Sequence, residues 1–531
     1  METKNTPKKQ TKRKKRRGDG RMNMMSENQR RVELIHLEEP ELEFRYSQRT
    51  QDPKEGLSIF GPYDTDQPSH PKNISYGLIG TQEGIKQFEE FAKHIVSPTI
   101  SARTQRELDL WPPYPGFEAA FSSVFPLKPT KSYTIDHQSI VNAATNYDPN
   151  TRSWQTVNLY LEGVKSITEG EDRIDLIICI TPDIIYEYVR PKGYVKQGHG
   201  EKIPRSIREE RAKYKSLLPD EDFQIYSYSV DFRRQLKARA MIYNTPIQII
   251  RESTMYIDHN TDTPPKHRRG LTPLSDRVWN IATTIYYKAQ GKPWRLVTAR
   301  AGVCYVGLVY SKTESTTEPN TACSAAQMFL DTGDGVVIRG NFGPWYSPQN
   351  KQLHLDQKEA QNLLTKVLET YRELHGQTLN EVFLHYRSYI NDEEYQGFKS
   401  AIPQGVKLVA IRIRIEEDFK LFREGRYPVP RGTLLKLGNK TAYLWTNGYK
   451  PKLKTYDGAE TPKPLRIDIQ YGEADIVQVA EDILGLTKLN YNNCKLANTQ
   501  PVTLEFSEDV GKILVTNPKI IDPKTQFRYY I

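Results

Sequence analysis

The pattern of apolar and polar residues is clearest in the second half of the chain. Val303–Tyr310, Ala325–Leu330 and Val336–Arg339 are short apolar runs of the kind that form strands. The glycines within Asp331–Gly335 suit a tight turn between the last two runs. We therefore expect three successive antiparallel strands in this region.

A helix is predicted next, from Asp356, because Glu359 completes a capping box and the apolar residues that follow keep helical spacing. Strand and helix patterns then alternate. We expect strand Val382–Tyr386, helix Asp392–Ala401, strand Leu408–Ile415, strands near Ala442–Trp445 and Leu465–Ile469, and helix Glu473–Leu484. Three antiparallel strands followed by helix, strand, helix and strand is the order of a ribonuclease-H-like domain.

The first half also mixes strands with helices. Residues 172–182 are an almost continuous apolar run, as in a strand buried on both faces, and a polar, basic stretch follows from about Lys192 to Lys215. After that stretch we expect helix Val230–Tyr243, strand Pro246–Ile250, a loop containing Thr261–Pro265, and helix Leu274–Ala289. This alternation predicts a Rossmann-like domain, and the fold class of the whole chain is α/β.

Charge is concentrated at the N-terminus. Residues 1–31 hold 12 Lys or Arg and 3 acidic residues, which leaves 63 basic against 62 acidic residues in the rest of the chain. We expect this tail to be disordered. It is either a nuclear-localisation or nucleic-acid-binding arm or a dispensable extension before a later start at Met22, Met24 or Met25. The folded part can bind a polyanion only through a local basic patch.

Several classes of protein are excluded by the composition. No apolar run approaches the length of a membrane span, and no apolar segment follows the basic N-terminus as it would in a secretory signal. The four cysteines are scattered, without a CxxC pair or a Cys/His cluster. A disulfide framework or a zinc site is therefore not expected, and the cytoplasm is the simplest location.

Several segments, in this order, resemble short prokaryotic Argonautes. They are DFRRQLKARAMIYNTPIQIIREST, YYKAQGKPWRL, GVCYVGLVYSK, AAQMFLDTGDG, GPWY, GEADIVQVAEDILGLTKLNYN and the terminal FRYYI. The resemblance covers roughly residues 32–531 and implies a guide-binding middle (MID) domain and a PIWI domain, without the N-terminal and PAZ domains of long Argonautes. The chain then divides into a disordered tail at 1–31, a MID domain with an N-terminal extension at 32–295, and a PIWI domain at 296–531.

The resemblance also implies a function. The protein would load a 5′-phosphorylated small guide RNA, recognise single-stranded DNA of an invading plasmid or phage, and activate a partner that carries an APAZ segment and an effector, as in SPARTA systems. A TIR-type effector that depletes NAD is expected, with sirtuin-like and nuclease effectors as alternatives. The heterodimer would oligomerise on target binding. Two other functions stay open: a self-sufficient guide-directed endonuclease, and a scaffold that binds no guide.

Four residues form a candidate phosphate site. Arg233 and Lys237 are four apart on one predicted helix and project from the same side, Gln248 follows the next turn, and Lys288 lies near the end of the next long helix. A guanidinium, lysine charges and a neutral donor suit a terminal phosphate. A basic helix surface, a polar loop and favourable placement at a helix C-terminus are the ordinary explanations. The four match the family's 5′-phosphate site, although relatives often carry Tyr or His in place of Arg233.

No catalytic residue is predicted. Two-metal hydrolysis requires several converging carboxylates. Where active PIWI domains have aspartates, this chain has Val309 on the first strand and Ser388 after LHYR. Other acids occur nearby, but a Gly-rich turn and a helix start account for them without a metal: Asp331, Asp334, Asp392, Glu393 and Glu394.

The C-terminus is the last candidate element. The chain ends in Tyr529, Tyr530 and Ile531, an aromatic and aliphatic ending that indicates a docked terminus and not a disordered tail. In Argonautes the terminal carboxylate helps to hold a divalent cation at the guide's 5′ end. The resemblance therefore implies a Mg²⁺ ion between the guide phosphate and the carboxylate of Ile531. The alternative is that these residues only complete the core.

Overall fold

The computed structural model describes residues 32–101, 104–196, 198–202, 225–226, 228–257, 271–312, 322–329, 335–343, 346–347, 352–375, 378–516 and 524–531. The predicted tail at 1–31, most of the basic stretch after Lys202, the loop with Thr261–Pro265 and the turn residues Asp331–Asp334 lie outside these ranges. No helix among the described residues combines the length and apolar character needed to cross a membrane.

The first half is built on a parallel four-stranded sheet in the order β5-β4-β6-β7, as in doubly wound α/β domains. Its strands are β4 (Tyr76–Gly80), β5 (Lys131–Thr134), β6 (Leu176–Thr181) and β7 (Ile247–Arg251). Every residue of β6 is buried because helices cover both faces. Ile178 packs with α2 (Gln82–Val96) and α11 (Leu274–Lys288), whereas Cys179 packs on the other face with α5 (His137–Ala144), α6 (Pro149–Thr168) and α10 (Phe232–Ala240).

The second half holds a nine-stranded sheet in the order β1-β16-β17-β18-β15-β14-β9-β10-β11. Its strands are β1 (Val32–His36), β9 (Val303–Lys312), β10 (Ala322–Phe329), β11 (Gly335–Gly343), β14 (Glu381–Tyr386), β15 (Lys407–Ile415), β16 (Thr433–Leu437), β17 (Thr441–Leu444) and β18 (Leu465–Tyr471). β9, β10 and β11 are antiparallel, and β14 and β15 continue in parallel from β9. This arrangement confirms the predicted ribonuclease-H-like order.

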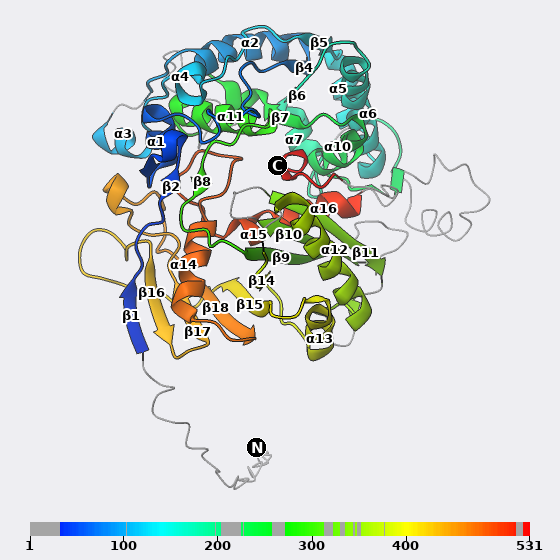
Figure 1. The fold of residues 1–531 in the computed structure, drawn as a ribbon. Coiled ribbons are helices and arrows are strands. Elements are labelled where there is room, and N and C mark those ends of the chain that lie inside the picture. Colours follow the sequence, from blue (N-terminus) through cyan, green and yellow to red (C-terminus); the bar gives the residue numbers. More distant parts are fainter. Residues whose placement is uncertain are drawn as a thin grey trace, which may run out of the picture.

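Helices cover both faces of this sheet (Figure 1). On one face α12 (Gln357–His375) and α13 (Asp392–Ala401) pack against the apolar residues of β9. Around the other face lie α14 (Ile476–Leu486), α15 (Val502–Glu505) and α16 (Ser507–Thr516). The expected helix Glu473–Leu484 starts later, because Asp475 caps it by accepting a hydrogen bond from the Val477 amide (3.1 Å).

The first strand differs from the predicted domain division. Residues 32–36 were assigned to the first domain, but β1 pairs antiparallel with β16 at the edge of the second sheet. The segment after it is fixed there by Glu39, whose carboxylate contacts Arg431 (2.7 Å) and Lys488 (2.6 Å). Burial raises the pKa of Glu39, but the two cations outweigh burial and lower it to about 2. The N-terminal segment therefore ties the halves together.

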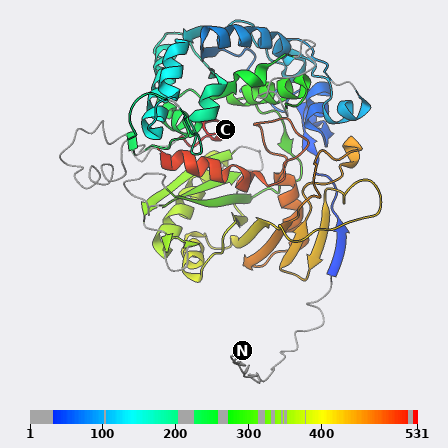
Figure 2. The same cartoon turned by 180° about the vertical axis from the view of Figure 1, so that it is seen from behind.

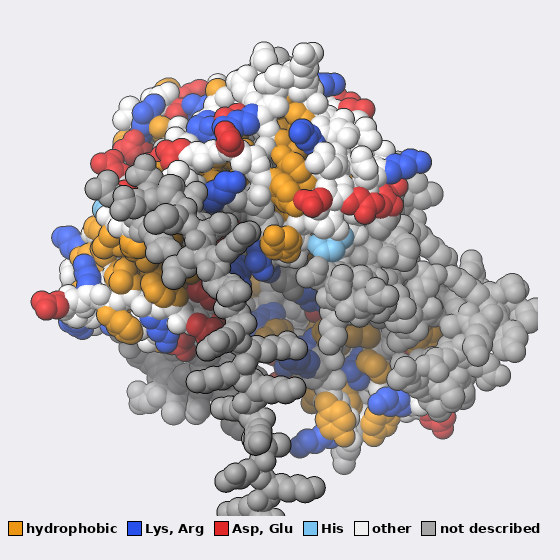
Figure 3. Space-filling view, turned by 90° about the horizontal axis from the view of Figure 1, so that it is seen from below, with side chains coloured by type: hydrophobic (Ala, Val, Ile, Leu, Met, Phe, Trp, Pro, Cys, Tyr) orange, Lys and Arg blue, Asp and Glu red, His pale blue; other side chains and the backbone are white. Residues whose placement is uncertain are grey.

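Two further elements connect the two halves: a small sheet and the helix α16. β8 (Arg295–Leu296) pairs with β2 (Leu42–Glu43), which in turn pairs with β3 (Arg49–Thr50). From behind, α16 runs along the boundary and contacts α10 of the first half and β9 of the second (Figure 2). Seen from below, this face of the molecule is hollowed near its centre, where Lys and Arg side chains are visible (Figure 3).

Candidate functional site

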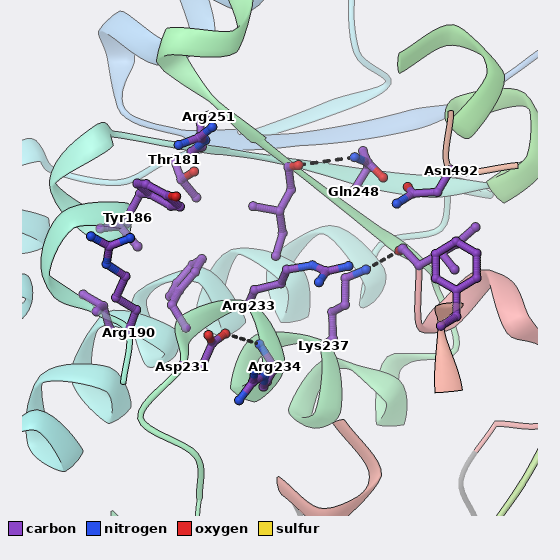
Figure 4. Close-up of a pocket in the computed structure, with 16 residues that line it drawn as sticks. Thr181, Tyr186, Arg190, Asp231, Arg233, Arg234, Lys237, Gln248, Arg251 and Asn492 are labelled. Atoms are coloured by element: carbon purple, nitrogen blue, oxygen red, sulfur yellow. Dashed lines mark hydrogen bonds between the residues drawn. The ribbon is translucent and has the colours of Figure 1, made fainter. Parts of the chain in front are cut away.

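A cavity of about 570 Å³ lies where the first half meets the C-terminus of the chain. The carboxyl ends of β6 and β7 form one wall, and Thr181 and Arg251 are partners in the last register position of these strands. α10 and α7 (Asp183–Tyr188) form the other walls (Figure 4). The carboxyl ends of parallel strands are common ligand-binding positions in α/β sheets.

The sequence of α10 explains how it presents its basic side chains. Asp231 caps the helix by accepting a hydrogen bond from the Arg234 amide (3.0 Å). Phe232 and Leu236 are buried in the core against α6. Arg233 and Lys237 are left to line the cavity, as their spacing predicted.

Lys237 contacts the end of the chain. Its ammonium donates to the backbone carbonyl of Tyr530 (2.9 Å) and to the carboxyl oxygen of Ile531. Ile531 lines the cavity with only 2% of its surface exposed, and the Tyr529 hydroxyl donates to the Asn244 carbonyl (2.9 Å). The expectation of a docked C-terminus is confirmed, and the terminal carboxylate belongs to the wall of the cavity.

Lys288 is placed differently from the prediction. It is fully buried and is not among the residues that line the cavity. Its ammonium donates to the carbonyls of Ile247 (2.9 Å) and Arg528 (3.2 Å) and to the carboxyl oxygen of Ile531. Burial, and then the charge of Arg233, lower its pKa to about 7. The nearby Cys179 opposes that shift. Through its contact with the carboxyl oxygen of Ile531, Lys288 supports the terminus from behind.

Gln248 lies on the β7 wall of the cavity, with Asn492 near it (Figure 4). The Gln248 amide nitrogen donates one hydrogen bond to the Ile249 carbonyl (3.2 Å), which leaves its amide oxygen and its second N–H for a ligand. The structure thus brings Arg233, Lys237, Gln248 and Ile531 into one cavity. Lys288 joins them only through the carboxylate.

Sequence reasoning missed part of this cavity. Tyr186, Arg190 and Arg251 line its opposite end, and all three are labelled in Figure 4. The available signals were weak: Tyr186 and Arg190 are four apart, and Arg251 ends the strand that contains Gln248. Arg234 lines the cavity as well, so five cationic side chains face one acidic side chain, Asp231, and the terminal carboxylate. Such an excess of positive charge favours an anionic ligand.

Val309 and Ser388, the positions at which the resemblance implies aspartates in active relatives, lie in the second half. The pairing of the parallel neighbours β9 and β14 ends with Gly307 opposite His385. Val309 lies two residues farther along β9, opposite Ala325 of β10, and Ser388 lies two residues after the end of β14. α15 packs beside them. His385 hydrogen-bonds the Thr503 hydroxyl (2.9 Å), and Arg387 donates to the Leu504 carbonyl (3.0 Å).

Close packing leaves little space around Gly307 and His385. A side chain at Gly307 would collide with the Thr503 carbonyl. Burial lowers the pKa of His385 to about 3, which keeps its ring neutral. Within the described ranges, no group of three or more His, Cys, Asp or Glu side chains is arranged to hold a metal ion.

Comparisons with known proteins give a clear result only for structure. No family model and no curated sequence matches the chain. A structure of Clostridium butyricum Argonaute, bound to a guide DNA with 5′ deoxycytidine and a 19-mer target DNA, aligns with TM-score 0.58 and 16% identity, covering 94% of this chain and 55% of that one.

Aquifex structures align similarly. Aa-Ago with externally bound siRNA gives TM-score 0.56 and 15% identity over 94% of this chain and 56% of that one. A structure of A. aeolicus Argonaute aligns with TM-score 0.54 and 14% identity, covering 93% of this chain and 55% of that one. The chain thus spans little more than half the length of these Argonautes. The sheets and these alignments show the fold: a Rossmann-like half followed by a ribonuclease-H-like half, as in the matched part of these Argonautes.

Proposed function

We propose that this protein binds a small guide RNA by its 5′ phosphate and uses it to recognise single-stranded target DNA. The cavity that joins Arg233, Lys237, Gln248 and the C-terminus carries the proposal. The cavity lies between the MID half and the chain terminus, where it can hold one end of a guide RNA. Single-stranded invader DNA is the target that the family resemblance implies.

Charge balance supports a terminal phosphate. Lys237 and Lys288 donate to the carboxylate of Ile531, and Arg233 lines the same cavity. Together they carry two net positive charges when both lysines are protonated, and between one and two near pH 7 because the pKa of Lys288 is about 7. A terminal phosphate carries about 1.5–2 negative charges near neutral pH. A 5′-hydroxyl guide would bring no negative charge to balance this excess, so the site should discriminate strongly between the two guide ends.

The donor set also fits a hard cation. The Ile531 carboxylate, the Gln248 amide oxygen and the Asn492 side chain offer oxygen ligands of the kind that Mg²⁺ prefers. With a guide in place, Ile531 and Gln248 would hold the ion. A bound Mg²⁺ would screen the repulsion between the phosphate and the carboxylate. The lysines that now contact the carboxylate would then be available to the phosphate.

We further propose that the protein does not cut its target. Val309 and Ser388 stand where metal-binding aspartates would be needed, and neither side chain is a useful Mg²⁺ ligand. Recognition would then be reported by a partner that carries an APAZ segment and an effector, with a TIR-type NAD-consuming effector expected first. The partner would occupy the role of the domains that longer Argonautes carry in the same chain.

The test begins with the nucleic acid that co-purifies with the chain. Sequencing it should reveal short RNAs, and binding assays should show a strong preference for 5′-phosphate over 5′-hydroxyl guides. Incubation of the guide-loaded protein with complementary DNA and Mg²⁺ or Mn²⁺ should leave the DNA intact. Equal affinity for both guide ends would refute phosphate recognition, and efficient cleavage would establish the alternative of a self-sufficient endonuclease.

A further inference from the structure

A second cavity, of about 390 Å³, lies where the first half meets two loops of the second half. The loops contribute residues 421–428 and 456–461, and α3 (Gln105–Leu110) contributes Arg106. The Arg106 guanidinium donates to the Tyr456 carbonyl (3.3 Å), which joins the two halves at this point. In Figure 1 the two loops lie below α3. This cavity shares no lining residue with the one at the C-terminus.

The first loop holds two arginines in place. The Arg423 guanidinium lies 5.2 Å from the centre of the Tyr449 ring, and its Nε donates to the Tyr427 carbonyl (3.0 Å). The Arg426 guanidinium lies 5.6 Å from the centre of the Tyr427 ring, and the two tyrosine rings stack with centres 5.0 Å apart. Gly425, with a φ of 107°, makes the turn between the two arginines. Stacking on a tyrosine holds a guanidinium but leaves its edge donors for a ligand.

The charge of this cavity is not balanced. None of its three arginines forms an ion pair with an acidic side chain of the described residues. Glu460 is the one acidic side chain among the described residues that line the cavity, so these residues carry two net positive charges. Asp457, in the second loop, pairs with Lys450 instead (2.9 Å), and Glu424 is not among the lining residues. The cavity therefore favours an anionic ligand.

An exposed aromatic ring completes the cavity. Phe422 lines it with 74% of its surface exposed. A phenyl ring beside guanidinium groups offers a stacking surface for a planar ligand, as in proteins that bind unpaired bases. The volume of about 390 Å³ is at the lower end of the range for small-molecule sites, which suits one nucleotide and not a longer strand.

We propose that this cavity binds a free nucleoside 5′-monophosphate, with its phosphate at Arg106, Arg423 and Arg426 and its base against Phe422. A phosphate monoester carries about 1.5–2 negative charges near neutral pH, which balances the two net positive charges of the cavity. A backbone phosphate within a strand carries only one. The ligand would contact both halves of the molecule, and its binding would require no guide, so this site goes beyond the proposed function.

The opposing interpretation is that the arginines only tie the loops to α3 and that Phe422 is an ordinary exposed apolar residue. Two variants separate these interpretations: Arg423→Gln/Arg426→Gln removes charge, and Phe422→Ala removes the ring alone. Arg45→Gln/Arg173→Gln is the matched control for charge. Arg45 also lies over a tyrosine ring, 4.4 Å from its centre, and the Arg173 side chain is 83% exposed.

The phosphate site at the C-terminus could also bind a nucleotide, so every variant is made in the full chain carrying Arg233→Ala/Lys237→Ala. Calorimetric titration compares adenosine 5′-monophosphate with ribose 5-phosphate. Arg423→Gln/Arg426→Gln should weaken both ligands at least about tenfold, the size of one charge-assisted contact. Phe422→Ala should weaken the nucleotide about tenfold, the size of one base-stacking contact, and change ribose 5-phosphate less than about twofold. The control variant should match its parent.

A third ligand distinguishes a free nucleotide from a strand. Short single-stranded DNA with a 5′-hydroxyl end should displace the nucleotide only weakly, and displacement at lower concentration than the nucleotide itself requires would mean that the cavity binds a strand. Absence of nucleotide binding, unchanged affinity in both variants, or equal losses of the two ligands in Phe422→Ala would also refute the proposal. If Arg233→Ala/Lys237→Ala does not fold, the unmodified protein saturated with 5′-phosphorylated RNA gives the same comparison.

Discussion

The carboxyl ends of two sets of parallel strands can be compared in this molecule. In the first half, β6 and β7 end at a cavity with five cationic side chains and the buried chain terminus. In the second half, the pairing of β9 and β14 ends beside α15, with Val309 and Ser388 beyond its last residues. Both are positions where such sheets bind ligands, but among the described residues the first gathers five cationic side chains around one cavity.

The difference shows that holding a nucleic acid and hydrolysing it make separate chemical demands. Binding a phosphate needs donors and positive charge, which Arg233 and Lys237 provide without any metal. Hydrolysis needs carboxylates placed to bind two metal ions, with a supporting shell around them. A protein can therefore carry the first without the second.

The largest effect is expected from Arg233→Ala/Lys237→Ala. Each charge-assisted hydrogen bond contributes about 1.5–3 kcal/mol, so affinity for 5′-phosphorylated RNA should fall on the order of 100-fold or more. Affinity for 5′-hydroxyl RNA should change little. Arg173→Ala/Lys165→Ala is a matched control, because these side chains are 83% and 59% exposed on the same half. Equal losses for both guide ends would mean that the pair is only a basic surface.

A smaller effect is expected when the terminal charge alone is removed. A chain ending in a carboxamide, made by protein ligation, keeps the size of Ile531 but cannot serve as an anionic ligand. If Mg²⁺ links the carboxylate to the guide, binding in Mg²⁺ should weaken about tenfold, the size of one charged contact, and EDTA should have no further effect. Tighter binding by the carboxamide form would show instead that the carboxylate only competes for Lys237 and Lys288.

The carboxamide should also lower the melting temperature without guide. Lys288 is fully buried, and the Ile531 carboxylate is a charged partner that its two backbone carbonyl contacts cannot replace. A tag added after Ile531 would test the same point less cleanly, because extra residues would enter the cavity that Ile531 lines. An unchanged melting temperature would show that Lys288 does not need the carboxylate.

A still smaller effect is expected on the pH dependence of stability, through the buried acid Glu394. Glu394 is fully buried at the start of α13, 3.2 Å from the His354 ring, and burial raises its pKa to about 8. Between pH 4.5 and 8 the folded state therefore keeps a proton that the unfolded state releases, so stability falls as pH rises through this window.

Glu394→Gln cannot ionise and avoids that loss. Its melting temperature should exceed that of the parent by a few degrees at pH 8 and by little at pH 5, given about 2–4 °C per kcal/mol for a domain of this size. Glu393→Gln, an exposed neighbour in the same turn, is the control. A difference that does not depend on pH would mean that Glu394 is ionised when folded, and its part in a metal site would have to be reconsidered.

The sequence predicted the regular elements better than the connections between them. The bounds of α13 agree with the expected helix, because Asn391 caps it and acids fill its first turn. The placement of β1 could not be predicted, since five residues with exposed Val32 and Leu34 carry no signal for a partner 400 positions away. Long-range pairing of this kind depends on the free edge of β16.

The candidate site was predicted to a similar degree. Arg233 and Lys237 were identifiable because helical spacing puts them on one side. Tyr186, Arg190 and Arg251 were not, because they meet only after β6 and β7 pair. Lys288 was found on the correct helix, but its burial behind the terminus depends on how Ile531 docks, which residue spacing cannot reveal.

The smallest effect is expected from Val309→Asp/Ser388→Asp, which restores carboxylates at the degenerate positions. Cleavage of target DNA in Mg²⁺ or Mn²⁺ should stay close to the background of the parent. Two ligands do not make a two-metal site, and absent supporting contacts alone typically cost 10–100-fold. Here the surroundings also oppose metal binding, because Arg387 lies next to Ser388 and α15 packs closely against Gly307. Retained preference for 5′-phosphorylated RNA would show that the variant is folded and loaded, so that the absence of cleavage reflects the site itself. Efficient metal-dependent cleavage by the variant would instead mean that the rest of a nuclease site is intact, and the separation of binding from hydrolysis would rest on two residues alone.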